Sequence, residues 1–127
     1  MAGLISNIVF QPIAVSTVIQ GQSRGGNPLG LEEAAQTWLV LTCGWSLEAD
    51  DRKVLATSVK FLNEVSEMAA SRGLLKTFLY LNDAVKDQRP IDSYGHENVQ
   101  RLKSISKEYD PDGVFQKLVK GGFRLGL

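Results

Sequence analysis

The apolar run between Thr37 and Trp45 limits most strongly what this chain can fold into. The run contains six consecutive residues, Trp38-Leu39-Val40-Leu41-Thr42-Cys43. A continuous apolar segment of this length is typical of a buried sheet strand. Asp50 and Asp51 follow and place negative charge where a helix would begin. Apolar residues then recur at helical spacing up to Gly73, a natural C-terminal cap. The pattern predicts a central strand followed by a long helix.

The segments around this pair are predicted from alternation and from turn residues. Residues 5–20 are expected to be extended. Ile5, Asn7, Val9 and Gln11 would lie on one face of a strand that bends at Pro12, and β-branched residues follow from Val15 to Ile19. Residues 20–29 are rich in glycine and predict a loop. Residues 78–82 predict a short strand and residues 83–90 a loop. A second helix is expected from about residue 93 to Tyr109, where Asp110-Pro111-Asp112-Gly113 would end it.

These elements predict one α+β domain over residues 1–127. We expect an antiparallel or mixed sheet with helices packed on one face. The other face would also need cover, because a sheet that bears Trp38, Leu39, Val40, Leu41 and Trp45 has too few polar positions to leave one side in water. A second copy of the chain, a separate protein or a large apolar ligand can cover it. We expect a homodimer that keeps a pocket for a small apolar substrate.

Composition narrows the classes of function. The chain has 127 residues, of which 43% are apolar and 22% charged, as in ordinary globular domains. Fourteen basic residues balance fourteen acidic ones, which argues against nucleic acid or an anionic membrane as partner. Cys43 is the single cysteine, so a disulfide framework is excluded and a cytoplasmic location is expected. No targeting segment and no apolar run of ~20 residues is visible.

The last third of the chain carries several short motifs in a fixed order. They are Tyr80-Leu81-Asn82, Tyr94-Gly95, Tyr109-Asp110-Pro111 and Gly121-Gly122-Phe123. With the segment 8–12 and the loop 25–27, they resemble the C-terminal substrate-domain part of berberine-bridge-type FAD-linked oxidoreductases, in particular the fungal ones. In that family a long flavin-binding domain comes first, and the open face of the sheet roofs the active site. The resemblance therefore implies a substrate domain without its flavin-binding domain.

The same resemblance has consequences for a cofactor. It implies that Asn82 lies close to the flavin ring and that Tyr80 belongs to the same segment. The His and Cys that tether the flavin in that family belong to the part not represented here, and Cys43 has no matching context. The chain also has no glycine-rich loop between a strand and a helix for a pyrophosphate, and the isolated glycines at 25 and 26 do not make one. We therefore expect no bound cofactor.

Three residues are candidates for catalysis. Tyr80 and Asn82, two apart on a predicted strand, would point to one face and offer hydrogen bonds to a substrate carbonyl. Alternatively, they are packing residues whose polar atoms satisfy the local backbone. His96 is the third candidate, because an imidazole titrates near neutral pH. An exposed histidine at a helix start is the ordinary alternative.

Three further residues are candidates for substrate binding. Gln11, Thr42 and Trp45 have polar or aromatic ends and lie in or next to the predicted strands. Core or turn positions explain them equally well. The acidic residues at 48, 50 and 51 are explained by a helix N-terminus, so we expect no metal site.

The favoured function is a cofactor-independent cyclase or isomerase of fungal-type specialised metabolism. Its substrate would be an apolar polyene or terpenoid, and a Diels-Alder-type cycloaddition fits. Such a reaction needs a shaped apolar cavity and one or two hydrogen bonds, which together can lower a barrier by a few kcal/mol. The alternatives are an accessory half of a split FAD-linked oxidoreductase and a non-catalytic binding remnant.

Overall fold

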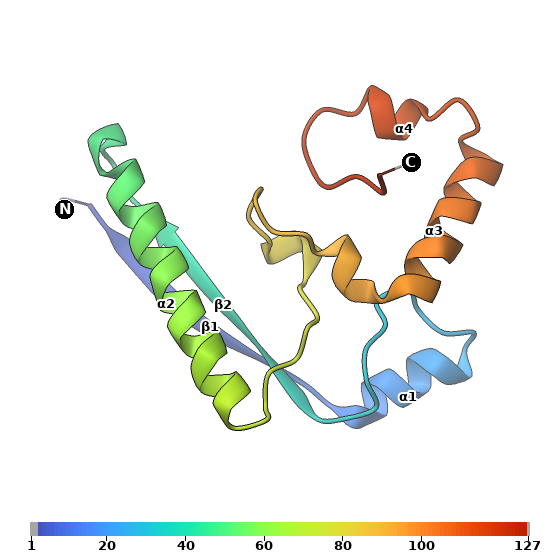
Figure 1. Ribbon diagram of the computed structural model, residues 1–127, viewed down its shortest axis with the longest axis horizontal. Coiled ribbons are helices and arrows are strands. Elements are labelled where there is room, and N and C mark those ends of the chain that lie inside the picture. The colour runs from blue at the N-terminus through green and yellow to red at the C-terminus, as the bar shows by residue number, and fades with distance from the viewer. Residues whose placement is uncertain (1–2, 127) are drawn as a thin grey trace. The chain divides into compact units, whose positions relative to one another are not determined.

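A computed structural model describes residues 3–126 and confirms the α+β class. The strands and helices follow one another from β1 to α4 (Figure 1). Their bounds are β1 Ile5–Ile13, α1 Val15–Ser23, β2 Gln36–Gly44, α2 Asp51–Ser71, α3 His96–Tyr109 and α4 Val114–Lys117, with 3-10 turns at Glu48–Asp50, Leu81–Asp83 and Ile91–Tyr94.

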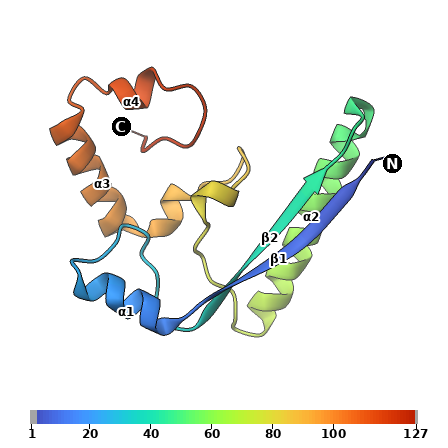
Figure 2. The same ribbon diagram turned by 180° about the vertical axis from the view of Figure 1, so that it is seen from behind.

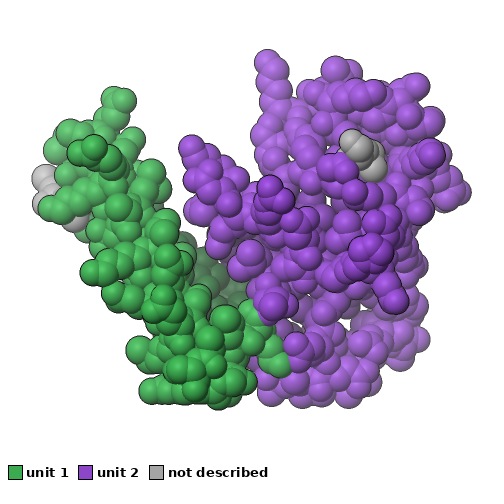
Figure 3. Space-filling view, in the orientation of Figure 1, with its two compact units in different colours: residues 1–12, 37–76 green, residues 13–36, 77–127 purple. Residues whose placement is uncertain are grey.

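The chain divides into two compact units (Figure 3). Unit 1 comprises residues 1–12 and 37–76, and unit 2 comprises residues 13–36 and 77–127. Each unit is therefore built from two segments that are far apart in the sequence. The prediction of one domain over residues 1–127 stays a prediction.

Unit 1 is an antiparallel pair of strands with a helix along it. β1 and β2 form a two-stranded sheet, and their bounds place Ile5 opposite Gly44. The α2 helix runs along these two strands (Figures 1 and 2). Cys43 Sγ lies 3.5 Å from Ser58 Oγ of α2. Since successive side chains alternate between the faces of a strand, the odd-numbered residues of β2 face α2 and the even-numbered ones face away.

The predicted strand at 37–45 and the predicted helix that follows it are confirmed, although β2 has one strand neighbour in the described sheet and is not central. Val54 of α2 is buried, with 3% of its surface exposed. The helix ends as predicted at Gly73, whose φ is 66°. There the Leu74 N–H donates to the Ala69 carbonyl at 2.9 Å, and the Gly73 N–H donates to the carbonyl of residue 70 at 3.0 Å. This pair of bonds closes the helix in a Schellman motif.

The prediction that Val15 to Ile19 continues the first strand is wrong, because these residues form α1. Their β-branched side chains favour a strand, but helical spacing brings Val15 and Val18 to one side. Val18 is 1% exposed, and burial at that position outweighs the local preference. The predicted loop at 20–29 therefore begins only after Ser23. Its Gly25 closes α1 with the same motif that Gly73 provides for α2.

The predicted strand at 78–82 is also wrong. This segment is irregular and then turns at Leu81–Asp83. A side chain takes the place of a partner strand, because the Leu79 N–H donates to Ser93 Oγ at 3.0 Å and Ser93 Oγ donates to the Pro90 carbonyl at 2.6 Å. Phe78 stacks on Tyr94 with a centroid distance of 5.8 Å. Tyr94 is buried and forms the centre of this part of unit 2.

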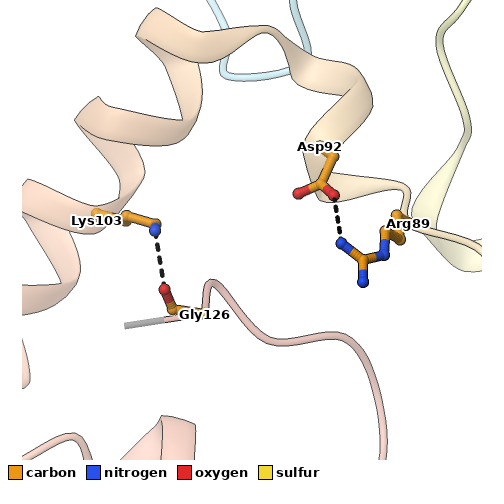
Figure 4. Close-up of polar contacts among 4 residues, drawn as sticks. All are labelled: Arg89, Asp92, Lys103 and Gly126. Carbon is orange, nitrogen blue, oxygen red and sulfur yellow. Dashed lines mark hydrogen bonds and ion pairs between the residues drawn. The ribbon is translucent and has the colours of Figure 1, made fainter.

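The predicted second helix is confirmed as α3, and the chain stops being helical at Asp110 as expected. The Asp110 carboxylate accepts hydrogen bonds from the Val114 N–H at 2.7 Å and the Phe115 N–H at 2.9 Å, which begins α4. Beyond α4 the chain folds back onto α3, where Lys103 Nζ donates to the Gly126 carbonyl at 2.8 Å (Figure 4). Through its two hydrogen bonds to the start of α4, Asp110 stabilises the connection between α3 and α4.

Candidate functional site

The structure brings Tyr80 and Asn82 together on unit 2. Asn82 Nδ2 donates to the Tyr80 hydroxyl oxygen at 3.0 Å. The turn at Leu81–Asp83 joins them, in place of the strand that the sequence predicted. Asn82 is exposed and Tyr80 is half-buried. The arrangement is a polar pair at the surface with one aromatic ring set into the protein, and its catalytic role stays a prediction.

Tyr94 connects this pair to the core of unit 2. Burial raises the pKa of the Tyr94 phenol, and the nearby Tyr80 hydroxyl raises it further. The Tyr94 hydroxyl is therefore neutral at physiological pH. The Tyr94 ring stacks on Phe78, which lies two residues before Tyr80 in the sequence, so this aromatic contact stabilises the segment that carries Tyr80. Nothing in the sequence pattern pointed to Tyr94 as the residue that supports the pair.

His96 is the first residue of α3 and is exposed. It follows Gly95, whose φ of 86° turns the chain into the helix. This is the helix-start position that the sequence predicted. Its part in catalysis stays a prediction.

The three candidate substrate-binding residues lie on or next to the strand pair of unit 1. The strand bounds place Gln11 opposite Trp38, so Gln11 and Thr42 share the face that points away from α2. Trp45 is oriented toward the helix, because its indole N–H donates to Asp51 Oδ1 at 2.6 Å. Gln11 and Thr42 can therefore contact one ligand on the open face, whereas the polar end of Trp45 is bound to α2.

The six candidates thus divide between the units. Gln11, Thr42 and Trp45 belong to unit 1, and Tyr80, Asn82 and His96 belong to unit 2.

A glycine that sequence reasoning missed shapes unit 2. A Cβ on Gly30 would lie 2.3 Å from the Tyr94 carbonyl oxygen and 3.0 Å from Asn98 Nδ2, which itself donates to that carbonyl. The φ of Gly30 is 65°, a region that side chains disfavour. Gly30 therefore allows the loop before β2 to lie against the start of α3. The turn sequence Asn27-Pro28-Leu29-Gly30 was the available signal.

The Gly25-Gly26 loop borders an open cavity of about 360 Å³, with Asn98 and Arg101 of α3 on its other side. This loop does not fit as a binding site for the pyrophosphate of FAD. Its N–H groups already donate to the carbonyls of Gln22 and Gly21, and it ends a helix and does not begin one. The exposed side-chain amide of Asn82, by contrast, can form hydrogen bonds with the polar edge of a ring, because an amide has both donor and acceptor atoms.

Within residues 3–126, no group of three or more His, Cys, Asp or Glu side chains is arranged to hold a metal ion. No helix in that range is long and apolar enough to cross a membrane.

Comparison with known proteins relates the chain to fungal proteins, among them FAD-dependent monooxygenases. It is 43% identical over 115 residues to a bifunctional solanapyrone synthase of Alternaria solani, across 91% of this chain and 22% of that protein. FAD-dependent monooxygenases of Fusarium proliferatum and Cochliobolus heterostrophus are 40% and 38% identical over 118 residues, across 91% of this chain and 23% of each protein. The chain therefore spans about a fifth of the length of these relatives. No protein-family model matches, and no solved structure does.

Proposed function

We propose that this chain forms part of the substrate site of a berberine-bridge-type FAD-linked enzyme of fungal specialised metabolism. The ordered motifs of the last third and the similarity to FAD-dependent monooxygenases support this function. The observation that carries it is the hydrogen bond between Asn82 and Tyr80. It holds an amide at the surface of unit 2, where a second part of the enzyme can bring a ring against it.

The polar atoms of the pair have separate tasks in this proposal. One amide hydrogen of Asn82 is used by the Tyr80 oxygen, and that bond fixes the plane of the amide. The amide oxygen and the second hydrogen of Asn82 have no other partner among the described residues, so they can bind the polar edge of a ring or a substrate carbonyl. When bound, FAD would supply the redox chemistry. The residues of this chain position the reacting molecule.

Apolar side chains of unit 2 offer a surface for the flavin-binding part. Tyr109, Phe115 and Leu118 lie at the end of α3 and around α4, and all three are more than half exposed. A protein that covered them would remove apolar area from water, which favours association.

Reconstitution tests the proposal. The remainder of the Fusarium proliferatum monooxygenase, without the segment that matches this chain, is expressed and mixed with the purified chain in the presence of FAD. We expect a complex that retains flavin after gel filtration. An Asn82→Ala chain should still form the complex but should alter the flavin absorbance spectrum and reduce turnover about tenfold or more.

An Asn63→Ala chain is the matched control, because Asn63 is an exposed amide on α2 in unit 1. It should leave the spectrum and the turnover unchanged. Failure of the two parts to associate, or an Asn82→Ala complex identical to the wild type, would contradict the proposal.

A second candidate is a cofactor-independent cyclase or isomerase for an apolar polyene or terpenoid, including a Diels-Alder-type reaction. The observation that favours it is again the polar pair, since an amide N–H can bind an activating carbonyl without any redox centre. Incubation of the purified, flavin-free chain with a triene aldehyde distinguishes the two. Cyclised product above the uncatalysed rate, lost in Asn82→Ala, supports this candidate, and an unchanged background rate rejects it.

A further inference from the structure

The outer edge of β1 has no partner within the described residues. β1 pairs with β2 along one edge of a two-stranded sheet, so its other edge presents a row of backbone N–H and C=O groups. The side chains around this edge are also open to solvent, since Ile5 is 67% and Phe10 is 65% exposed. A sheet of two strands is marginal in water and gains stability from a third strand.

The segment lacks the charges that normally protect such an edge. Residues 1–23 contain no Asp, Glu, Lys or Arg, and the first charged residue is Arg24. Edge strands that must stay unpaired usually carry lysine or an inward-pointing charge. A second strand can therefore approach β1 without burying any charge on this side.

The sequence of β1 matches itself when it runs antiparallel. Pairing of two copies about Val9 sets Ile5 opposite Ile13 of the partner copy, Asn7 opposite the partner's Gln11 and Ile8 opposite the partner's Phe10. At these positions apolar side chains face apolar ones and an amide faces an amide, while Ser6 lies opposite the partner's Pro12. A shift by two residues in either direction would set Val9 opposite an amide and break this match.

We propose that β1 is a homodimer interface in which two copies pair antiparallel about Val9. The product is a four-stranded sheet in the order β2-β1-β1-β2, with both α2 helices on one side. On the open side, Gln11 lies next to the partner's Asn7. The partner thus adds an amide to the face that carries Gln11 and Thr42, and the ligand surface on unit 1 is incomplete in a single copy.

Sedimentation equilibrium of the whole chain over a range of concentrations tests the interface. The wild type should dimerise, and Val9→Lys should weaken the dimer about tenfold or more, because two ammonium groups would meet at the symmetry axis. Val59→Lys is the control, since Val59 is a similarly exposed valine on α2. It should dimerise like the wild type.

Cysteine cross-linking tests the register. In a Cys43→Ser background, Val9→Cys should form a disulfide-linked dimer on oxidation, because residues on the axis lie within disulfide distance of each other. Ile5→Cys should not, since its partner would be Ile13. A monomer at all concentrations, or equal cross-linking of both variants, would overturn the proposal.

The interface is independent of the flavin proposal. Asn82→Ala should leave dimerisation unchanged, because Asn82 belongs to unit 2. If β1 became protected from hydrogen exchange only in the complex with the flavin-binding part, the edge would belong to that part and the homodimer would be rejected.

Discussion

The two units of this chain are held together in different ways. Unit 1 consists of two nine-residue strands and a 21-residue helix, so backbone ladders account for most of its order. The helices of unit 2 are shorter than α2, and single side chains fix its loops: Ser93 holds Leu79, and Asp110 holds the start of α4. Loss of one side chain should therefore disturb unit 2 locally, whereas unit 1 should respond mainly to its buried contacts.

The aromatic residues allow the units to be followed separately. Both tryptophans, Trp38 and Trp45, belong to unit 1, whereas the tyrosines Tyr80, Tyr94 and Tyr109 belong to unit 2. Tryptophan fluorescence therefore reports on unit 1 and tyrosine absorbance on unit 2. If both signals change at the same urea concentration, the units unfold together as one domain.

The largest effect is expected for Gly30→Ala. The new methyl group would collide with the Tyr94 carbonyl in a conformation that alanine disfavours, which should cost about 3 kcal/mol. The tyrosine transition should move to lower urea. Gly44→Ala is the control, since no atom lies within 4 Å of its Cβ position and its φ is not positive. An equal shift of the tryptophan transition would break the comparison.

Val54→Ala tests unit 1 in the same way. Removal of two buried methyl groups should cost about 2 kcal/mol, and the tryptophan transition should report it. Val59→Ala on the same helix removes the same atoms from an exposed position and should cost less than about 0.5 kcal/mol. Similar losses for the two variants would show that Val54 does not anchor α2.

Asp110→Ala should cost about 1 kcal/mol, because two N–H groups at the start of α4 lose their acceptor. Hydrogen exchange should rise at Val114 and Phe115 and stay unchanged in α2. Asp112→Ala removes a neighbouring exposed carboxylate that does not accept these bonds and should behave like the wild type. Faster exchange throughout unit 2 would mean that the effect is not local.

The smallest effect is expected at the exposed ion pairs. Arg89 Nη1 lies 3.6 Å from Asp92 Oδ2 in unit 2 (Figure 4), and Lys60 Nζ lies 3.8 Å from Glu64 Oε1 in unit 1. Solvent screens both pairs, so Arg89→Ala and Lys60→Ala should each change stability by less than about 0.5 kcal/mol. A larger loss in either variant, measured by urea titration, would show that the pair is not merely a surface contact.

The sequence predicted the long regular elements because their signals are local. The apolar run of β2, the spacing and Gly73 of α2, and the stop at Asp110 each lie within a few residues of the structure they determine. It failed where the deciding partner is distant. Val18 lies in a helix because its side chain is buried there. The Leu79 N–H forms a hydrogen bond with Ser93, which lies fourteen residues away in the sequence.

The candidate site shows the same limit. Tyr80 and Asn82 were expected to act together, and they do meet, but through a turn that was not predicted. The support from Tyr94 and the close approach of Gly30 depend on contacts between separate segments. Such contacts leave no periodic pattern in the chain.

Pro12 has a consequence for how this chain behaves at high concentration. An uncharged strand that is rich in β-branched residues is the kind of segment from which amyloid grows. In amyloid, each added layer pairs its backbone with a complete row of donors and acceptors in the layer below. Pro12 has no N–H and therefore interrupts such stacking near one end of β1. Replacement of Pro12 by valine would lengthen the stackable segment, so fibril formation should become faster.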